Sequence, residues 1–167
     1  MREKVKFLII ISLLLTFLSC TSRKVVVIGK SPHPPSAKNY GQKVASGNHL
    51  QNGMKFFRKE KFSKALQEFK KAVDKDPSNW EAFYYLGLTY QKMGYYKKSI
   101  SSFEMAIELN KGNKVWISEI RVCLGRSYES LGNFEKAKAQ YLSALSLDPT
   151  NKKASNGYSR VKRKNKK

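Results

Sequence analysis

The chain repeats one pattern three times between residues 46 and 151, and this repetition constrains its fold more than any other feature. Gly53, Gly87 and Gly125 are separated by 34 and 38 residues. Four further columns keep the same two spacings: Ala72, Ala106 and Ala144; Phe69, Phe103 and Tyr141; Phe56, Tyr90 and Tyr128; and Ala65, Ser99 and Ala137. A fixed period of this length is typical of a solenoid, in which each unit packs only against its neighbours.

Within each unit the apolar residues fall into two segments with helical spacing. The second unit shows this best, with Phe83, Leu86, Gly87 and Tyr90 in one segment and Ile100, Phe103, Ala106 and Ile107 in the other. Residues three and four apart share one face of a helix, so each unit is predicted to be a helical hairpin. Pro77 and Pro149 end a second helix, because proline cannot continue it. One hairpin cannot bury its own apolar face, so the three are expected to stack.

These columns, and the segment LGLTYQKMGYYKKSISSFEMAIELN at residues 86–110, resemble the tetratricopeptide repeat. The resemblance implies an all-α solenoid of helical hairpins with three repeats, at residues 46–79, 80–113 and 118–151, followed by a capping helix. The first repeat departs most from the family pattern, because His49 and Asn52 stand where bulky apolar residues are usual.

Four extra residues, KVWI at 114–117, precede the third repeat, and two local structures fit them. Four residues make about one helical turn. Asn113 could therefore cap a helix that begins early and carries Trp116, Ile120 and Leu124 on one face. Alternatively, the four residues lengthen the loop.

Residues 152–167 carry eight basic residues and no acidic one. Ala154, Tyr158 and Val161 are spaced to cover the open end of the stack as a final helix. The lysines at 162, 164, 166 and 167 are then expected to fray into solvent. The segment Lys152–Lys167 has three interpretations: a contact with anionic lipid or an envelope polymer, a contact with nucleic acid, or a solvated tail without a partner.

The first 22 residues have the proportions of a secretory signal, with a basic start, a mostly apolar stretch from Phe7 to Ser19, and then Cys20. The apolar stretch is shorter than the about 20 residues that span a bilayer. Ser19 before Cys20 resembles the lipobox of bacterial lipoproteins. That resemblance implies a signal peptide at 1–19, lipidation of Cys20 and export. An ordinary signal peptide cleaved near Ser19 and an uncleaved anchor are the alternatives.

Residues 20–45 are predicted to be a flexible tether, because they are rich in proline, glycine and polar residues. Val25–Ile28 could form a short strand within it. The tether and residues 152–167 together carry most of the chain's net charge of +21. Acylation of Cys20 would leave Cys123 as the only free thiol, so no internal disulfide is expected.

No segment of the sequence has the pattern of an active site, a cofactor site or a metal site. GKS at 29–31 lacks the earlier glycine of a phosphate-binding loop, because that position is Lys24. DKDPSN at 74–79 resembles the start of a calcium loop, but Asn79 replaces its glycine and Tyr85 its closing glutamate. His33 and His49 have no cysteine or carboxylate cluster at ligand spacing. The chain is therefore predicted not to be an enzyme.

In tetratricopeptide stacks the first helix of each repeat lines a concave groove, which commonly holds a peptide or a partner helix. Carried over position by position, the resemblance implies a groove of Leu50, Met54, Phe57 and Arg58; Tyr84, Leu88, Gln91 and Lys92; and Val122, Arg126 and Glu129. Apolar and aromatic residues with a basic edge suit an amphipathic helix or an apolar segment. The family variant that clamps a C-terminal carboxylate has Lys or Arg and Asn where this chain has Leu50 and Met54. Some of these side chains could instead pack against the tether or the final helix.

These features predict an adaptor or scaffold of the bacterial cell envelope, lipid-anchored at the periplasmic face or the cell surface, that binds a partner protein in its groove. The alternative is a binder of anionic lipid or envelope polymer that uses the basic flanks, with the repeats as a spacer. Salt separates the two, because polyanion binding weakens with ionic strength and an apolar contact does not. An exported protein rarely meets nucleic acid.

Overall fold

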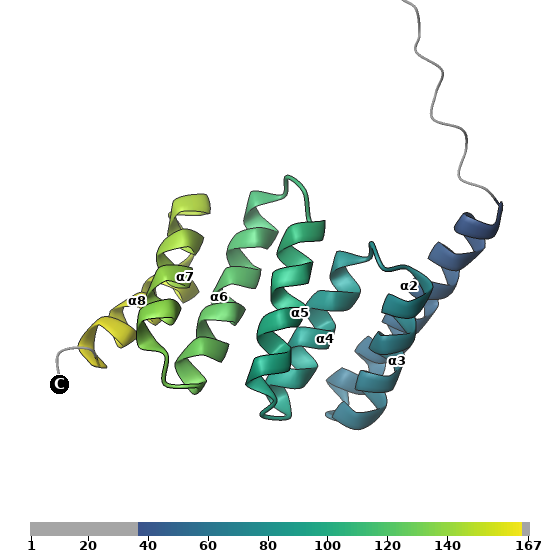
Figure 1. Ribbon diagram of the computed structural model, residues 1–167, viewed down its shortest axis with the longest axis horizontal. Coiled ribbons are helices and arrows are strands. Elements are labelled where there is room, and N and C mark those ends of the chain that lie inside the picture. The colour runs from purple at the N-terminus through teal and green to yellow at the C-terminus, as the bar shows by residue number, and fades with distance from the viewer. Residues whose placement is uncertain (1–36, 165–167) are drawn as a thin grey trace, which may run out of the picture. The chain divides into compact units, whose positions relative to one another are not determined.

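The computed structural model describes residues 37–164, and this range contains seven α-helices and no β-strand. The helices are α2 Ala37–Arg58, α3 Phe62–Lys75, α4 Trp80–Lys92, α5 Tyr96–Leu109, α6 Lys114–Ser130, α7 Phe134–Leu147 and α8 Lys152–Lys164 (Figure 1). The predicted all-α fold is confirmed. The signal peptide at 1–19, the lipidated Cys20, the strand at Val25–Ile28 and the tether up to residue 36 are predictions that lie outside the described residues.

The helices form two layers. Each helix packs against the next one along the chain; α2, α4, α6 and α8 also contact one another in order, whereas α3, α5 and α7 do not. In Figure 1, α3, α5 and α7 lie in front, with α2, α4 and α8 behind them. We call α2, α4, α6 and α8 the inner layer, because their closer spacing curves the array toward them. The first helix of each repeat lies in this layer.

The glycine column allows the two helices of each hairpin to touch. A Cβ atom on Gly53 would lie 2.5 Å from the ring of Phe69, and one on Gly87 would lie 2.7 Å from the ring of Phe103. The third repeat has the same contact between Gly125 and Tyr141, also at 2.7 Å. All three rings are fully buried, and burial of such a side chain contributes about 1.5 to 3 kcal/mol. The columns seen in the sequence are therefore the packing centres of the hairpins.

Helix α6 begins one turn early, as one of the two interpretations predicted. The Asn113 side chain accepts a hydrogen bond from the Trp116 amide at 3.2 Å and so caps the helix. Ile120 and Leu124 are buried, whereas Trp116 stays partly exposed at 39%. The four extra residues are therefore helix and not a longer loop.

Helix α2 is longer than predicted. It begins at Ala37, so residues 37–45, assigned from the sequence to the tether, are helical. The sequence has no proline between Pro35 and Pro77, so nothing in this stretch interrupts a helix. Tyr40 and Val44 nevertheless remain exposed, which means that the core does not hold this extension.

Helix α8 covers the end of the stack as the predicted capping helix. Ala154 and Val161 are fully buried and Tyr158 packs against the same cluster. Lys162 and Lys164 lie within the helix, which corrects the expectation that they fray. A Cβ atom on Gly157 would lie 2.5 Å from the ring of Tyr141, so α8 packs on α7 as the first helix of a further repeat would.

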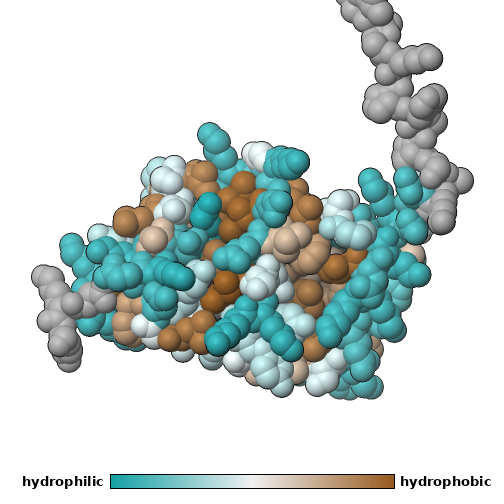
Figure 2. Space-filling view, viewed as in Figure 1, coloured by the Kyte–Doolittle hydropathy of each residue, from teal (hydrophilic) through white to brown (hydrophobic). Residues whose placement is uncertain are grey.

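The outer face is apolar in the middle and polar at its ends. Figure 2 shows hydrophobic surface gathered over α5 and α6, with hydrophilic surface over α2 and α3 and over α7 and α8. Met105 and Val115, on α5 and α6, are among the exposed apolar residues. Between residues 37 and 164, the length and hydropathy needed to cross a bilayer are not combined in any helix.

Candidate partner-binding groove

The predicted groove residues lie on the inner layer, but two of them are part of the core. Leu50 is 5% exposed and packs in the cluster between α2, α3 and α4. Val122 is 0% exposed and packs in the cluster that includes α7 and α8. Neither side chain can touch a partner, which corrects their assignment to the groove. The position in the repeat identifies the helix that lines the groove, but at Leu50 and Val122 neighbouring helices cover the side chain.

The α2 part of the groove contains an aromatic side chain and is only partly exposed to solvent. Met54 and Phe57 are partly buried against the first cluster, and Arg58 is exposed. The Phe57 ring packs edge-on against Phe62 at 5.5 Å and Tyr85 at 6.4 Å between centroids. The Phe57 ring thus connects α2 with α3 and α4 through aromatic contacts.

The middle of the groove contains an aromatic cluster of Trp80, Tyr84 and Trp116, of which the sequence interpretation assigned only Tyr84 to the groove. Trp80 and Tyr84 of α4 lie 5.3 Å and 5.8 Å from Trp116 of α6 between ring centroids. Tyr84 and Leu88, both predicted groove residues, are partly buried against the core here. Burial, more than any neighbouring charge, raises the pKa of the Tyr84 phenol, so the hydroxyl stays protonated.

At the other end of these helices, the structure brings together four predicted residues: Gln91, Lys92, Arg126 and Glu129. They line a pocket of about 470 Å³ that extends across α4, α6 and α8, touches the start of α5, and also includes Tyr96, Ser130, Arg160 and Lys164. We call it the basic pocket, because it holds four cationic side chains and one carboxylate. The sequence interpretation missed Arg160 and Lys164, since residues 152–167 were read as a cap and tail. The signal was Gly157, which follows Gly125 by 32 residues and marks α8 as an inner helix.

The single carboxylate of the basic pocket is fully engaged. Arg160 donates two hydrogen bonds of 2.8 Å, one to each oxygen of Glu129, and Lys164 Nζ lies 3.5 Å from Oε1. The Tyr141 hydroxyl donates to Oε2 at 3.1 Å. These donors lower the pKa of Glu129 below its usual value of 4.5, and the hydrogen bonds from Arg160 have the largest effect. Burial, helped by Glu129, raises the pKa of Tyr141 to about 12, so this donor keeps its proton.

Gln91 joins α4 to α6 beneath the basic pocket. Its Nε2 donates to the Cys123 carbonyl at 3.0 Å and to Ser127 Oγ at 2.8 Å. The Ser127 hydroxyl also lies 2.9 Å from Ser99 Oγ of α5. Both amide protons of Gln91 are thus used within the protein. Lys92 and Arg126 are the exposed cationic side chains of α4 and α6 at this surface.

The other chemically distinctive groups do not form a reactive site. Cys123 is buried, and desolvation raises its pKa to about 11, so the thiol is not a nucleophile at neutral pH. Among residues 37–164 no group of His, Cys, Asp and Glu side chains is placed to hold a metal ion. His49 Nδ1 lies 2.7 Å from Glu68 Oε2, an ion pair between α2 and α3 when the imidazole is protonated.

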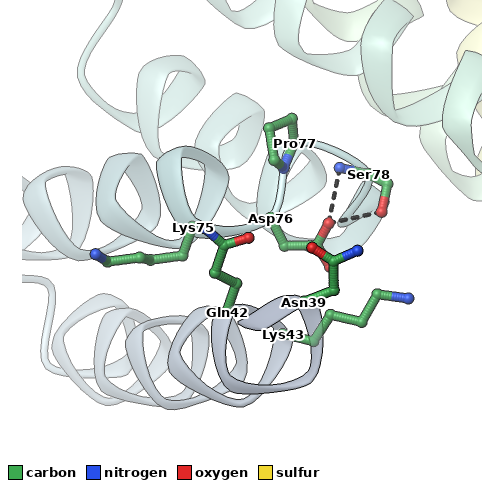
Figure 3. Close-up of a pocket in the computed structure, with 7 residues that line it drawn as sticks. All are labelled: Asn39, Gln42, Lys43, Lys75, Asp76, Pro77 and Ser78. Atoms are coloured by element: carbon green, nitrogen blue, oxygen red, sulfur yellow. Dashed lines mark hydrogen bonds between the residues drawn. The ribbon is translucent and has the colours of Figure 1, made fainter. Parts of the chain in front are cut away.

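A second pocket, of about 360 Å³, lies where the start of α2 meets the loop after α3. It is lined by Asn39, Gln42 and Lys43 of α2 and by Lys75, Asp76, Pro77 and Ser78; Figure 3 shows Asn39 and Gln42 pointing toward the loop, with the Lys43 and Lys75 side chains extending away from each other. Asp76 Oδ1 accepts hydrogen bonds from the amide and the hydroxyl of Ser78, at 3.0 and 2.6 Å. Its carboxylate therefore shapes the turn between two repeats.

Comparisons with known proteins agree with this architecture. A model described as tetratricopeptide repeat matches residues 80–113 and 118–151, and one described as TPR repeat matches residues 53–94. None of the curated proteins compared with this chain matches it.

Many solved structures share the fold. The first TPR of Spaghetti (RPAP3), bound to the HSP90 peptide SRMEEVD, has a TM-score of 0.70 at 22% identity, covering 75% of this chain and 96% of its own. The Arabidopsis OM64 TPR domain has 0.69 at 20%, covering 74% and 98%. The second TPR domain of human RPAP3, in complex with the HSP70 peptide SGPTIEEVD, has 0.65 at 22%, covering 74% and 98%. The matched segments, the glycine and aromatic columns and the two-layered array agree, and this chain is a tetratricopeptide-repeat protein.

Proposed function

We propose that this protein is an adaptor of the bacterial cell envelope that holds a segment of a partner protein against its inner layer. The observation that carries the proposal is the inner surface itself, where a partly exposed aromatic cluster and a basic pocket lie along the same helices, α4 and α6. Surfaces that combine apolar anchors with charged groups at their edge are typical of peptide-binding grooves.

The comparisons support a protein as the partner. Tetratricopeptide repeats typically mediate contacts between proteins, and two of the similar structures hold peptides of HSP90 and HSP70. In this chain the positions of the carboxylate clamp in the first repeat are Leu50, which is buried, and Met54. The partner segment is therefore bound by other residues, and the scaffold has a binding role without catalysis.

The location at a membrane rests on the sequence of the first 22 residues. A basic start, a short apolar stretch and Ser19 before Cys20 support cleavage after residue 19 and acylation of Cys20. Several acyl chains on one residue hold a protein to a bilayer stably, because each buried methylene contributes about 0.8 kcal/mol.

Site-specific photocrosslinking in cells tests the binding role. A photoreactive amino acid replaces Arg58 or Ser130, both exposed at the inner groove, or, as controls, Lys70 or Lys97 on the outer helices α3 and α5. We expect one protein to be captured from the two inner positions and not from the outer ones. Mass spectrometry identifies it, and the purified protein is then tested for direct binding to the full chain.

Equal capture from inner and outer positions would contradict the proposal. Recovery of lipid or polymer from all four positions would instead support the alternative function, in which the basic flanks bind an anionic surface and the repeats act as a spacer.

The anchor is tested separately with Cys20→Ser. We expect the unchanged chain to partition into the detergent phase of a Triton X-114 extract and the variant to move to the aqueous phase. Detergent partition of both proteins would mean that acylation at Cys20 is not the anchor.

A further inference from the structure

We propose that the basic pocket binds an acidic segment of the partner protein, and that Lys92 and Arg126 are the residues that contact its carboxylates. This inference rests on the proposed function, because it names the chemistry of the segment that the inner groove holds. It differs from recognition of a chain terminus, since side-chain carboxylates within a segment satisfy it.

Within the part of the chain that the structure describes, only two of the four cationic side chains in the basic pocket have a carboxylate partner. Glu129 forms ion pairs with Arg160 and Lys164 of α8, at 2.8 and 3.5 Å, so its one negative charge is shared between these two cations. Lys92 and Arg126 have no carboxylate within ion-pair distance among residues 37–164, and both are exposed. The pocket thus has a net charge of about +3, and two of its cations are available to a ligand.

These two cations are held on a rigid base. Lys92 follows Gln91 directly, and the Gln91 side chain is fixed to α6 by two hydrogen bonds, at 3.0 and 2.8 Å. Arg126 lies in the next turn of α6 after Cys123, whose carbonyl accepts one of these bonds. The α4–α6 contact therefore sets the spacing between the backbone positions of Lys92 and Arg126 before a ligand arrives.

The charge of the ligand follows from complementarity, and its source follows from the sequence. Residues 21–36 and 165–167 contain basic side chains and no acidic one, so these two segments supply no side-chain carboxylate to the pocket. A recess of about 470 Å³ admits a few side chains of a peptide, whereas a flat bilayer surface does not enter it. The aromatic cluster lies at the other end of the same helices and suits apolar residues in the same segment. The occupant is an acidic and apolar segment of another protein.

The experiment measures binding of a short fluorescein-labelled peptide in which aspartate and leucine alternate, with both ends blocked so that it has no terminal carboxylate. The full chain is purified in a neutral detergent. Lys92→Gln and Arg126→Gln are each expected to weaken binding about fivefold, the effect of one partly exposed charge pair. The matched controls are Lys70→Gln and Arg163→Gln, which remove the same charge from exposed positions outside the pocket and are expected to leave the affinity unchanged.

Three results would overturn the proposal. The first is an equal loss in the control variants, or equal binding of a peptide with asparagine in place of aspartate, because either shows attraction to net charge or to leucine alone. The second is displacement of the peptide by phosphatidylglycerol vesicles with the same dependence on Arg126, which would make the ligand a lipid headgroup. The third is absence of peptide binding together with a dimer that Arg126→Gln dissociates in analytical ultracentrifugation, which would make the occupant a second copy.

Failure here is distinguishable from failure of the proposed function. If crosslinking from Arg58 and Ser130 captures the same partner in the unchanged chain and in Arg126→Gln, the groove holds a protein but the acidic segment is wrong. If no protein is captured from the inner positions, the proposed function itself is wrong.

Discussion

The junctions between repeats are of two kinds, and the middle one differs from the outer two. After α3 and after α7, a serine of the preceding inner helix donates to the end of the outer helix: Ser46 to the Ala72 carbonyl at 2.8 Å, and Ser118 to the Ala144 carbonyl at 3.0 Å. The same hydroxyls accept from Asn79 at 3.0 Å and Asn151 at 2.9 Å. Each of these asparagines begins the next inner helix, so one polar relay joins three helices.

The middle junction, between α5 and α6, has no such relay. Trp80 stands in the column of Ser46 and Ser118, and Asn110 and Lys111 stand where the outer junctions have Asp and Pro. Asn113 caps α6, and the extra turn of this helix places Trp116 against Trp80, with 5.3 Å between ring centroids. Aromatic packing thus replaces the polar relay at the one junction that also forms the middle of the groove. The junction that lacks the Ser–Asn hydrogen bonds is therefore the one that carries the partly exposed aromatic cluster.

The largest expected effect comes from breaking the contact that all three hairpins share. In Gly125→Ala the new Cβ would lie 2.7 Å from the Tyr141 ring, whose position is fixed by a fully buried environment. Overpacking of this kind costs about 2 to 3 kcal/mol of unfolding free energy. The matched control is Gly41→Ala, on α2, where the new Cβ meets nothing within 4 Å. Urea unfolding followed by circular dichroism measures both, and equal stability of the two variants would contradict the packing argument.

The second prediction compares an outer junction with the middle one. Asn151→Ala removes a buried side chain that donates to Ser118 and whose Oδ1 accepts from the Ala154 amide at 3.1 Å, so about 2 kcal/mol should be lost. Asn113→Ala removes only an exposed cap and should cost about 1 kcal/mol. Thermal and urea unfolding measure the difference, and an equal or larger loss for Asn113→Ala would remove the distinction between the junctions.

The third prediction uses pH to test how α8 is held. Glu129 has a lowered pKa in the folded protein, so its contribution is complete above its ordinary pKa of 4.5 and is lost as pH falls through the lowered value. Glu129→Gln should therefore be less stable than the unchanged chain at neutral pH, by about 1 to 2 kcal/mol, and the difference should shrink on acidification. Glu68, whose pKa His49 and Lys71 also lower, is present in both proteins and cancels. A difference that stays constant down to the lowest pH would show that the charge of Glu129 does not hold α8.

The same comparison explains what the sequence could predict. The glycine and aromatic columns are short-range packing rules repeated at a fixed period, so the hairpins and their stacking followed from them. The cap at Asn113 was one of two interpretations that the sequence left open. Exposure within the groove did not follow, because burial of Leu50 or Val122 depends on which neighbouring helix covers it. The sequence predicted only part of the basic pocket, because Arg160 and Lys164 reach it from α8. Gly157 marks α8 as an inner helix, but its spacing from Gly125 differs from the two spacings between the other glycines of the column.

The smallest expected effect tests whether an unpaired side chain at the middle junction lowers the free energy of unfolding. Asn110 is 6% exposed, and its Nδ2 is buried without a hydrogen-bond partner among residues 37–164. A buried donor left unpaired costs free energy that an apolar residue avoids, so Asn110→Ala should stabilise the chain by about 0.5 to 1 kcal/mol. Asn151→Ala at the outer junction changes stability in the opposite direction, although both replace a buried asparagine. Urea unfolding of the two variants side by side gives the sign directly. A loss of stability in Asn110→Ala would mean that this side chain supports the turn before α6, and that the middle junction, like the outer two, depends on a polar contact.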